Sequence, residues 1–279
     1  MPSVALITGA ASGIGRHWAG VLAQRPDEFQ LVLTDLDEAG PRLAFREAAR
    51  LIVRRLDIRA AAEWQTVIDV TLARFGRLDY LFNIAGGGRP AFLLDQPTEA
   101  IDAQIDLNLK GPLLGMRLAG AVMARQGGGH IINVASLAGV APTPGNALYS
   151  AAKAGLRHAS LAAAIELRRQ GVAVTVIAPD LVDTPLMRAN MARGEAVALM
   201  YSGAAPLTVV DLERAFWRAL RERPLEITLP RWRGWLARLS NLSPALLLAL
   251  YEPLRRRGLR RLEAARRRHN NSESGGGPA

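Results

Sequence analysis

The feature that most constrains the fold is a glycine-rich segment directly after the first apolar run of the chain. The run Val4–Ile7 is continuously apolar, and Thr8-Gly9-Ala10-Ala11-Ser12-Gly13-Ile14-Gly15 follows it before helical spacing begins at Arg16. Glycines here permit a tight turn and a close backbone approach to phosphate, and the N-terminus of the next helix attracts negative charge. The segment predicts a nucleotide-binding turn between a strand and a helix, although an ordinary turn of this kind would use the same glycines.

Short apolar runs alternate with segments of helical spacing as far as residue 230. The runs predict seven strands, near 3–8, 29–35, 51–56, 78–83, 129–135, 172–178 and 225–229. This alternation indicates an α/β fold with a single doubly wound parallel sheet of the Rossmann type, covered by helices on both faces. At 279 residues the chain is long enough for one large domain, which we assign to 1–230.

Composition excludes several other classes of protein. The absence of cysteine rules out disulfide scaffolds and thiolate metal sites, and the four scattered histidines predict no metal site either. The N-terminus lacks the basic and long apolar regions of a signal peptide. The apolar run Ala245–Tyr251 is far shorter than the ~18 residues of a membrane-spanning helix. We therefore expect a cytoplasmic protein, with contact at a membrane surface as a further possibility.

Asp35 stands at the end of the second predicted strand, about twenty residues after the glycine-rich turn. Its carboxylate would accept hydrogen bonds from the adenosine ribose hydroxyls and repel a 2′-phosphate. Leu36 rather than a basic residue follows it, so NAD(H) is favoured over NADP(H), which Arg16 keeps possible. The alternative is that Asp35 caps a helix expected over 37–50, a role that Asp37 would fill equally well.

Tyr149 and Lys153 stand four residues apart in Tyr149-Ser150-Ala151-Ala152-Lys153, at the start of a predicted helix, and so share one helix face. A nearby ammonium stabilises a phenolate and lowers its pKa toward the range useful for acid–base catalysis. Ser136 follows the fifth predicted strand and would hydrogen-bond the same reacting oxygen at the carboxyl edge of the sheet. Alone, a tyrosine and a lysine at this spacing are more often part of a solvated helix face.

The ordered combination of these motifs resembles the short-chain dehydrogenase/reductase family over roughly residues 3–230. The matching motifs are T-G-A-A-S-G-I-G at 8–15, N-I-A-G at 83–86, Ser136 and Y-S-A-A-K at 149–153. The resemblance implies an NAD(P)-dependent oxidoreductase acting on a secondary alcohol or carbonyl. It also implies a homodimer or homotetramer formed through the helices near 109–125 and 149–170, whose apolar faces would serve equally as ordinary core.

The resemblance also implies a role for each matching residue. Tyr149 would be the general acid/base, Lys153 would bind the nicotinamide ribose and lower the tyrosine pKa, Ser136 would orient the substrate, and Asn108 would complete a water-linked proton relay. The cofactor contacts would be Gly9, Ser12, Gly13, Ile14 and Gly15 along the dinucleotide, Asp35 at the ribose, Asp57 and Ile58 at the adenine, Asn83, Ala85 and Gly86 in the centre, and Pro179, Val182 and Thr184 at the nicotinamide, with Tyr149 and Lys153.

Several of these residues have a simpler structural alternative. Asp57 would also cap the helix expected near Ala60, and Thr184 the helix after the sixth strand. Asn83 would tie adjacent strands together, and Asn108 looks like an interruption of a helix. Such roles leave the catalytic trio of Ser136, Tyr149 and Lys153 unaffected.

Two positions depart from the family pattern. Ile84 stands where asparagine is more common, and Asp180 stands where glycine usually follows the proline after the sixth strand. Asp180 introduces a charge near the expected nicotinamide, so the contacts implied for Val182 and Thr184 are less secure.

Substrate selection falls to the loops at the strand ends, which are largely apolar. Leu94, Leu137, Val140, Leu186, Met187, Met191 and Met200 would line a lipophilic pocket, although methionines at helical spacing often pack in a core. We therefore expect a hydrophobic alcohol or ketone, such as a long-chain, retinoid-like or steroid-like molecule. A polar sugar or a hydroxy acid is the less favoured substrate.

The net charge of +10 is concentrated in residues 231–268, which hold eleven arginines against Glu252 and Glu263. Ser243 and Pro244 predict a helix start, and Pro253 is expected to end or kink that helix. Beyond it, Leu254, Leu259, Leu262 and Ala265 share one stripe of a basic helix, with Trp232 and Trp235 upstream, which is typical of an interfacial helix. A helix packed on the body of the protein or on another subunit is an equal alternative.

Two further expectations concern the same end of the chain. Nucleic-acid binding is not expected. Residues 269–279 are expected to be disordered.

A function of another class uses the same fold. A non-catalytic nucleotide-binding regulator or scaffold would keep the glycine-rich turn without turnover. Retention of Ser136, Tyr149 and Lys153 together argues against it.

Overall fold

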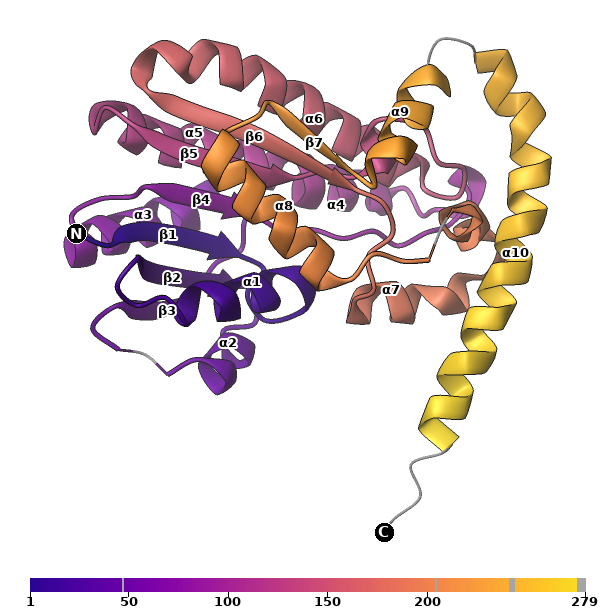
Figure 1. Cartoon of the computed structure of the whole chain (residues 1–279), viewed down its shortest axis with the longest axis horizontal. Helices are drawn as coiled ribbons and strands as arrows, with labels where there is room; N and C mark the ends of the chain where they lie inside the picture. The colour runs from indigo at the N-terminus through magenta and orange to yellow at the C-terminus, as the bar shows by residue number, and fades with distance from the viewer. Residues whose placement is uncertain (47, 204, 241–243, 275–279) are drawn as a thin grey trace.

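A seven-stranded parallel sheet forms the centre of the protein (Figure 1). The computed structural model describes residues 1–46, 48–203, 205–240 and 244–274. The strands of the described residues lie in the order β3-β2-β1-β4-β5-β6-β7 and confirm each predicted strand to within two residues. They are β1 (Ser3–Thr8), β2 (Phe29–Asp35), β3 (Leu51–Arg55), β4 (Tyr80–Asn83), β5 (Gly129–Val134), β6 (Val172–Pro179) and β7 (Glu226–Leu229).

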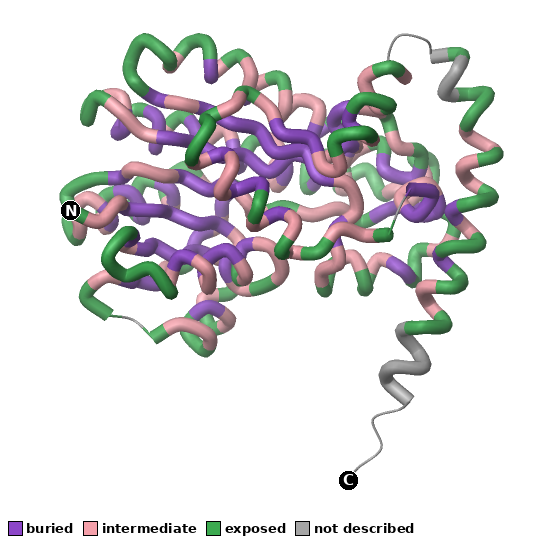
Figure 2. Tube along the Cα trace, viewed as in Figure 1, coloured by how far each residue is buried: buried purple, intermediate pink, exposed green. Residues whose placement is uncertain are grey.

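Helices cover both faces of this sheet, as its continuously apolar strands predict (Figures 1 and 2). One core lies against α1 (Gly13–Ala23) and α8 (Val209–Glu222), where Trp18 stacks on Phe216 at 4.9 Å between ring centroids. The other core contains Trp64 and lies against three helices on the opposite face. These helices are α3 (Ala61–Phe75), α5 (Gly111–Arg125) and α6 (Ala147–Leu167).

The strand order reverses at β1, which pairs with β2 on one side and with β4 on the other. At such a reversal the segments that follow the two inner strands diverge to opposite faces and leave a crevice at the carboxyl edge of the sheet. The glycine-rich turn follows β1 and the segment 84–88 follows β4, so both line this crevice. Figure 1 shows that the remaining connections after β5 and β6 lead to the same edge.

Short elements build the loops around that edge. They are α2 (Ala39–Ala44), η1 (Leu93–Asp95), α4 (Glu99–Ile105), η2 (Asp106–Lys110), η3 (Leu137–Gly139), α7 (Pro185–Asn190) and η5 (Met191–Ser202). The short turn η4 (Arg168–Gln170) instead joins α6 to the start of β6, at the opposite edge of the sheet. The helix predicted over 37–50 is wrong in length, because α2 ends at Ala44. Ala48 instead forms an antiparallel bridge with Leu51, and Gly40 within α2 favours helix only weakly.

Two further helices follow the sheet: α9 (Arg231–Ser240) and α10 (Pro244–Ser274). In Figure 1, α10 runs along the carboxyl edge of the sheet and contacts η5. The expectation that Pro253 ends its helix is wrong, because α10 continues through it. Pro253 and Ala249 are both exposed, so the carbonyl group that loses its intrahelical donor can bond to water.

The division of the chain at residue 230 stays a prediction, although α9 begins at Arg231. The predicted tail over 269–279 falls partly within α10, whose helix extends to Ser274, and partly on 275–279, which lie outside the described residues. Ser243 also lies outside them.

Candidate active site

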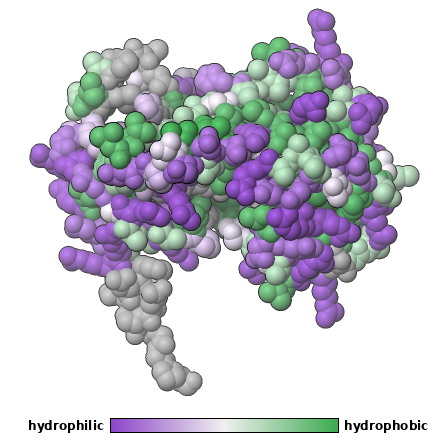
Figure 3. Space-filling view, turned by 180° about the vertical axis from the view of Figure 1, so that it is seen from behind, coloured by the Kyte–Doolittle hydropathy of each residue, from purple (hydrophilic) through white to green (hydrophobic). Residues whose placement is uncertain are grey.

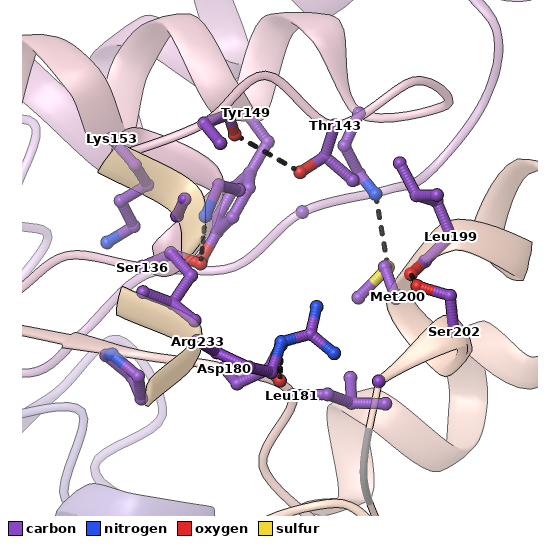
Figure 4. A pocket seen from close by; sticks show the side chains of 18 of the residues that line it. Ser136, Thr143, Tyr149, Lys153, Asp180, Leu181, Leu199, Met200, Ser202 and Arg233 are labelled. Atoms are coloured by element: carbon purple, nitrogen blue, oxygen red, sulfur yellow. Dashed lines mark hydrogen bonds and ion pairs between the residues drawn. The ribbon is translucent and has the colours of Figure 1, made fainter. Parts of the chain in front are cut away.

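A cavity of about 1140 Å³ opens beyond the carboxyl ends of β4, β5 and β6 (Figure 4). Ser136, Tyr149 and Lys153 all line it, as do residues of α7, η5, α9 and α10. Its other lining is largely apolar, including Leu137, Leu186 and Met200. The structure thus brings the three predicted catalytic side chains to the wall of one cavity.

Ser136 and Tyr149 face each other because their elements meet at this edge. Ser136 directly follows β5, where its hydroxyl accepts a hydrogen bond from the Ala138 amide at 3.1 Å and begins η3. Tyr149 lies in the first turn of α6, and its side chain lines the same cavity wall as that of Ser136. Burial raises the pKa of Tyr149 to about 12, against the lowering effect of the neighbouring Ser136 hydroxyl.

Lys153 is buried one helical turn beyond Tyr149. Its ammonium donates a hydrogen bond to the Val134 carbonyl at 2.9 Å and lies 5.7 Å from the centroid of the Tyr149 ring. Burial lowers the pKa of Lys153 to about 8. The predicted lowering of the Tyr149 pKa by this ammonium is therefore not found in this arrangement, because desolvation of the phenol dominates.

Asn108 interrupts a helix, as its sequence context suggests, by forming the π-helical turn η2 between α4 and α5. Its amide oxygen accepts from the Gly87 amide at 3.0 Å, and its Nδ2 donates to the Gly87 carbonyl at 2.8 Å. Asn108 thereby holds the glycine segment after β4 against the catalytic wall. Sequence reasoning stopped at Gly86 and missed Gly87 and Gly88, for which the three consecutive glycines were the available signal.

The glycine-rich turn has the shape that a dinucleotide phosphate requires. Gly13 has φ +53°, and a Cβ on Gly15 would overlap the Gly9 carbonyl, so both positions need glycine. Among the described residues no side chain caps the N-terminus of α1, where Ser12 is the first boundary residue. Its first amide groups are thus available to an anion, and this region fits the pyrophosphate of a dinucleotide.

Asp35 reaches back from the end of β2 to the same turn. Its Oδ2 accepts from the Ala11 amide at 2.9 Å and its Oδ1 from the Asp37 amide at 3.2 Å. Asp37, in turn, accepts from the Ala39 amide at 3.0 Å in the first turn of α2. The alternative that Asp35 caps this helix is therefore wrong, because among the described residues its carboxylate accepts from the Ala11 and Asp37 amides and from no amide of α2. The boundary residue of α2, Glu38, makes no side-chain cap hydrogen bond within the described chain either.

Asp57 and Ile58 lie at the end of β3. The Asp57 carboxylate binds the Arg59 guanidinium at 2.7 Å, which holds its pKa at about 2. It does not cap α3, whose boundary residue Ala60 receives no side-chain hydrogen bond. Ile58 is buried in the core, and its carbonyl accepts from the Trp64 indole at 2.9 Å.

The remaining predicted contacts divide between sheet and loop. Asn83 is buried and donates to the Pro112 carbonyl at 3.2 Å and to the Asn133 side chain at 2.8 Å, so it ties β4 to β5 and α5. Ala85 donates its amide to the Thr8 hydroxyl at 3.0 Å, beside the glycine-rich turn.

β6 ends at Pro179, and the segment that follows it passes beside the glycine-rich turn. Val182 pairs with Leu207, and Thr184 caps α7 by accepting from the Met187 amide at 3.3 Å. The Thr184 methyl also lies beside Gly13. The capping alternative for Thr184 is therefore correct, and the residue still borders the turn.

Asp180 has a partner that the sequence pattern did not reveal. Its Oδ2 lies 2.9 Å from Nε of Arg233, which α9 brings to the cavity wall from more than fifty residues away along the chain. Burial raises the pKa of Asp180, and the Arg233 guanidinium opposes that rise.

Comparison with known proteins identifies the family. A family model for short chain dehydrogenases matches residues 3–194. The chain is a short-chain dehydrogenase/reductase. An uncharacterized oxidoreductase of Staphylococcus saprophyticus is 36% identical over 188 residues, which cover 66% of this chain and 80% of that protein. A 2,5-dichloro-2,5-cyclohexadiene-1,4-diol dehydrogenase of Sphingobium indicum is 36% identical over 187 residues, covering 66% and 74%.

Solved structures agree with this assignment. A short-chain dehydrogenase/reductase from Burkholderia phymatum, in complex with NAD, superposes with a TM-score of 0.74 at 28% identity, covering 88% of this chain and 95% of that one. The present short-chain dehydrogenase/reductase is thus an oxidoreductase that acts on CH–OH or carbonyl groups with a nicotinamide cofactor. A scaffold without turnover is accordingly the less supported alternative.

The apolar residues predicted to select substrate separate into two groups in this enzyme. Leu137, Leu186, Met187 and Met200 line the cavity. Val140 and Met191 instead pack in small cores, and Leu94 is almost fully exposed, so these three do not line it. Sequence reasoning missed the contribution of α9 and α10, which comes through Trp232, Leu236, Leu239, Leu248, Leu250, Tyr251 and Leu254.

Proposed function

We propose that this enzyme interconverts a lipophilic secondary alcohol and its ketone with NAD(H), using Tyr149 as the general acid/base. The observation that carries the proposal is the convergence of Ser136 and Tyr149 on the wall of one large apolar cavity, with Lys153 buried behind them. An apolar cavity with a few convergent polar groups is the usual form of a small-molecule site.

In the reductive direction Tyr149 donates its hydroxyl proton to the carbonyl oxygen of the substrate, while the Ser136 hydroxyl holds that oxygen in place. A pKa of about 12 keeps the phenol protonated at neutral pH, so it is ready to donate. Lys153 and the ordered glycine segment held by Asn108 position the tyrosine. When bound, the nicotinamide ring supplies the hydride.

The preference for NAD(H) is supported by the environment of Asp35. A carboxylate offers about four acceptor positions, and the Ala11 and Asp37 amides use two of them. The two remaining acceptor positions suit the two hydroxyls of an adenosine ribose, whereas a 2′-phosphate would face the negative charge.

The other proposed cofactor contacts follow the dinucleotide. We assign Gly9, Ser12, Ile14 and Gly15 to the phosphates, with Asp57, Ile58, Asn83, Ala85, Gly86, Pro179, Val182 and Thr184 as the further contacts.

We further propose that the enzyme touches a membrane surface at the cavity mouth. Trp232, Leu236, Leu239, Leu248 and Leu250 are exposed and also line the cavity, so they form its rim. Figure 3 shows hydrophobic side chains beside the upper end of α10, and exposed arginines follow along this helix. An apolar rim with neighbouring basic charge suits a lipid surface from which a lipophilic substrate enters.

An oligomer formed through α5 and α6 remains part of the proposal. Ile165 on α6 is 74% exposed, which leaves a large apolar side chain on the outer face of these helices.

A location in the cytoplasm also stays a prediction from the sequence. Within the described residues, every helix is too short or too polar to cross a membrane.

The test of the catalytic proposal is Tyr149→Phe, with Tyr80→Phe as its matched control because Tyr80 lies on β4 in the sheet. Tyr149→Phe is expected to reduce ketone turnover by about 100-fold or more, the usual contribution of general acid catalysis, while NADH binding is retained. Titration with NADH and NADPH, followed by nicotinamide fluorescence, measures binding and cofactor preference. Retained turnover in Tyr149→Phe would refute the catalytic role, and tighter NADPH binding would refute the role of Asp35.

A further inference from the structure

Arg233 extends into the substrate cavity from α9. Its Nε is held by Asp180, and the two side chains are only 22% and 17% exposed. In Figure 4 its guanidinium group reaches past Asp180 into the open space between Ser136 on one side and Met200 and Ser202 on the other. Arg233 is therefore a fixed, largely buried cation that faces the same cavity as the reacting groups.

The guanidinium has donors that the protein does not use. It carries five N–H groups, and within the described part of the chain only Nε has a recorded side-chain acceptor, the Asp180 carboxylate. Other polar side chains on this side of the cavity are already bonded to the protein. Asn190 donates to the Gly88 carbonyl at 3.1 Å, and Ser202 donates to the Leu199 carbonyl at 2.7 Å.

The charge of Asp180 restricts what can bind these donors. Asp180 and Arg233 together carry no net charge, so an anionic ligand would gain from the guanidinium and lose to the adjacent carboxylate. A neutral oxygen acceptor makes hydrogen bonds to the free N–H groups without that repulsion. Such bonds from an ionised donor are stronger than those between neutral groups.

We infer that Arg233 binds a second, neutral oxygen of the substrate, such as an ester, amide or ketone carbonyl, at a distance from the reacting carbon. The inference rests on the proposed oxidoreductase function and narrows its substrate class. The preferred substrates are lipophilic ketones or alcohols with a second oxygen function, rather than plain hydrocarbon chains or free carboxylic acids.

The test uses three sets of probes of matched chain length: methyl ketones, keto esters with the ester at increasing separation from the ketone, and the corresponding keto acids. Wild-type enzyme is expected to prefer one of the keto esters in kcat/KM. Arg233→Met is expected to lower the ratio of keto ester to methyl ketone by about 10-fold to 100-fold, the effect of losing a hydrogen bond from a charged donor. Arg231→Met is the matched control, because Arg231 is exposed on the same helix.

Asp180→Asn provides a second, opposite prediction. It leaves the guanidinium without its counter-charge, so keto acids are expected to gain relative to keto esters by about tenfold. The double variant Asp180→Asn/Arg233→Met removes both charges, avoids an isolated buried carboxylate, and is expected to lose the keto ester preference without the gain for keto acids.

Binding of each probe to the wild type and to the variants, measured by calorimetry in the presence of NADH, gives a readout that does not need turnover. Equal keto ester to methyl ketone ratios in wild type, Arg231→Met and Arg233→Met, in binding and in turnover, would overturn the inference. The inference would also be overturned if Arg233→Met lowered kcat/KM equally for all probes and weakened NADH binding. That result would place Arg233 at the cofactor. If no probe is reduced by the wild type, the proposed function fails, and the binding ratios still decide the role of Arg233.

Discussion

At the scale of single residues, burial sets the protonation of titratable groups in the active site and within the sheet. It raises the pKa of Tyr149 to about 12 and lowers that of Lys153 to about 8. His130 on β5 is affected most, with a pKa lowered to about 3 by burial. One ring nitrogen of His130 lies 2.9 Å from the Thr175 hydroxyl, while Nδ1 has no partner among the described residues.

His130 should make stability depend on pH. Its pKa is lower in the folded state than the ordinary value near 6.5, so below about pH 6.5 the unfolded chain binds a proton that the folded chain does not. The free energy of unfolding therefore falls as pH falls, by about 2 kcal/mol between pH 7 and pH 5 from this residue. Urea unfolding of wild type and His130→Gln at both pH values measures the difference.

The His130→Gln variant is expected to lose less stability over this interval than the wild type by that amount. His158→Gln is the matched control, because it makes the same substitution at a histidine that is exposed on α6 rather than buried in the sheet. If wild type and His130→Gln lose equal stability between the two pH values, burial of His130 has no such effect.

Much of the site at this scale was predictable because it depends on local order along the chain. Ser136 follows a strand, Tyr149 and Lys153 share a helix turn, and parallel strands bring their carboxyl ends to one edge. The pKa of Tyr149 was not predictable, since it depends on burial by distant segments. Arg233 was missed for the same reason, because only the position of α9 in the fold brings it to Asp180.

At the scale of elements, α10 is a wall of the active site rather than a separate arm. Leu262 is buried with Met191, Val197 and Tyr201 of η5, and the Arg266 guanidinium donates to the Met191 carbonyl. The predicted apolar stripe of α10 is thus the face that contacts the body of the protein. The alternative of a packed helix is therefore correct for this part of α10.

Gly258 is the point at which α10 comes closest to η5. A Cβ at this position would overlap the Ala198 carbonyl of the neighbouring backbone, which cannot move as a side chain can. Gly258→Ala should therefore displace α10 and destabilise the protein by about 1–3 kcal/mol, the usual cost of overpacking. Thermal unfolding measures this as a lower Tm.

Gly20→Ala is the matched control for that prediction. Gly20 lies within α1 and a Cβ there meets nothing within 4 Å, so the same substitution should stabilise the protein by about 0.5–1 kcal/mol through higher helix propensity. An unchanged or higher Tm for Gly258→Ala would show that α10 is not packed on η5 as described.

The bounds of the elements were predictable where burial fixed them and not elsewhere. The strands are buried on both faces, and their apolar runs mark them closely. The helix after β2 was overestimated, because the bridge between Ala48 and Leu51 competes with it. Of the two effects expected of Pro253, ending or kinking its helix, the first is wrong, since its position on an exposed helix face allows water to replace the lost donor and α10 continues.

At the scale of the whole molecule, charge and apolar surface are placed together at one end. The residues that carry most of the net charge, 231–268, include the helices that close the cavity. Arginines of this region that bind Asp180, Glu226 and Glu195 hold it on the body, whereas Arg260, Arg261 and Arg267 are exposed. This end of the molecule therefore combines an apolar rim with basic charge that is free to meet an anionic surface.

Trp235 allows the membrane proposal to be tested without altering the cavity. It is 62% exposed on α9, beside the rim, and does not line the cavity among the described residues. Burying a large apolar side chain in the interface contributes about 1.5–3 kcal/mol, so Trp235→Ser should weaken binding to anionic vesicles by about tenfold or more. Sedimentation with phosphatidylserine-containing vesicles measures binding, and turnover of a water-soluble ketone should be unchanged.

Leu43→Ser is the matched control. It alters an 89% exposed leucine on α2 and should have no effect on vesicle binding. Equal sedimentation of wild type, Trp235→Ser and Leu43→Ser would exclude the rim as a membrane contact and leave the basic charge of α10 without that role.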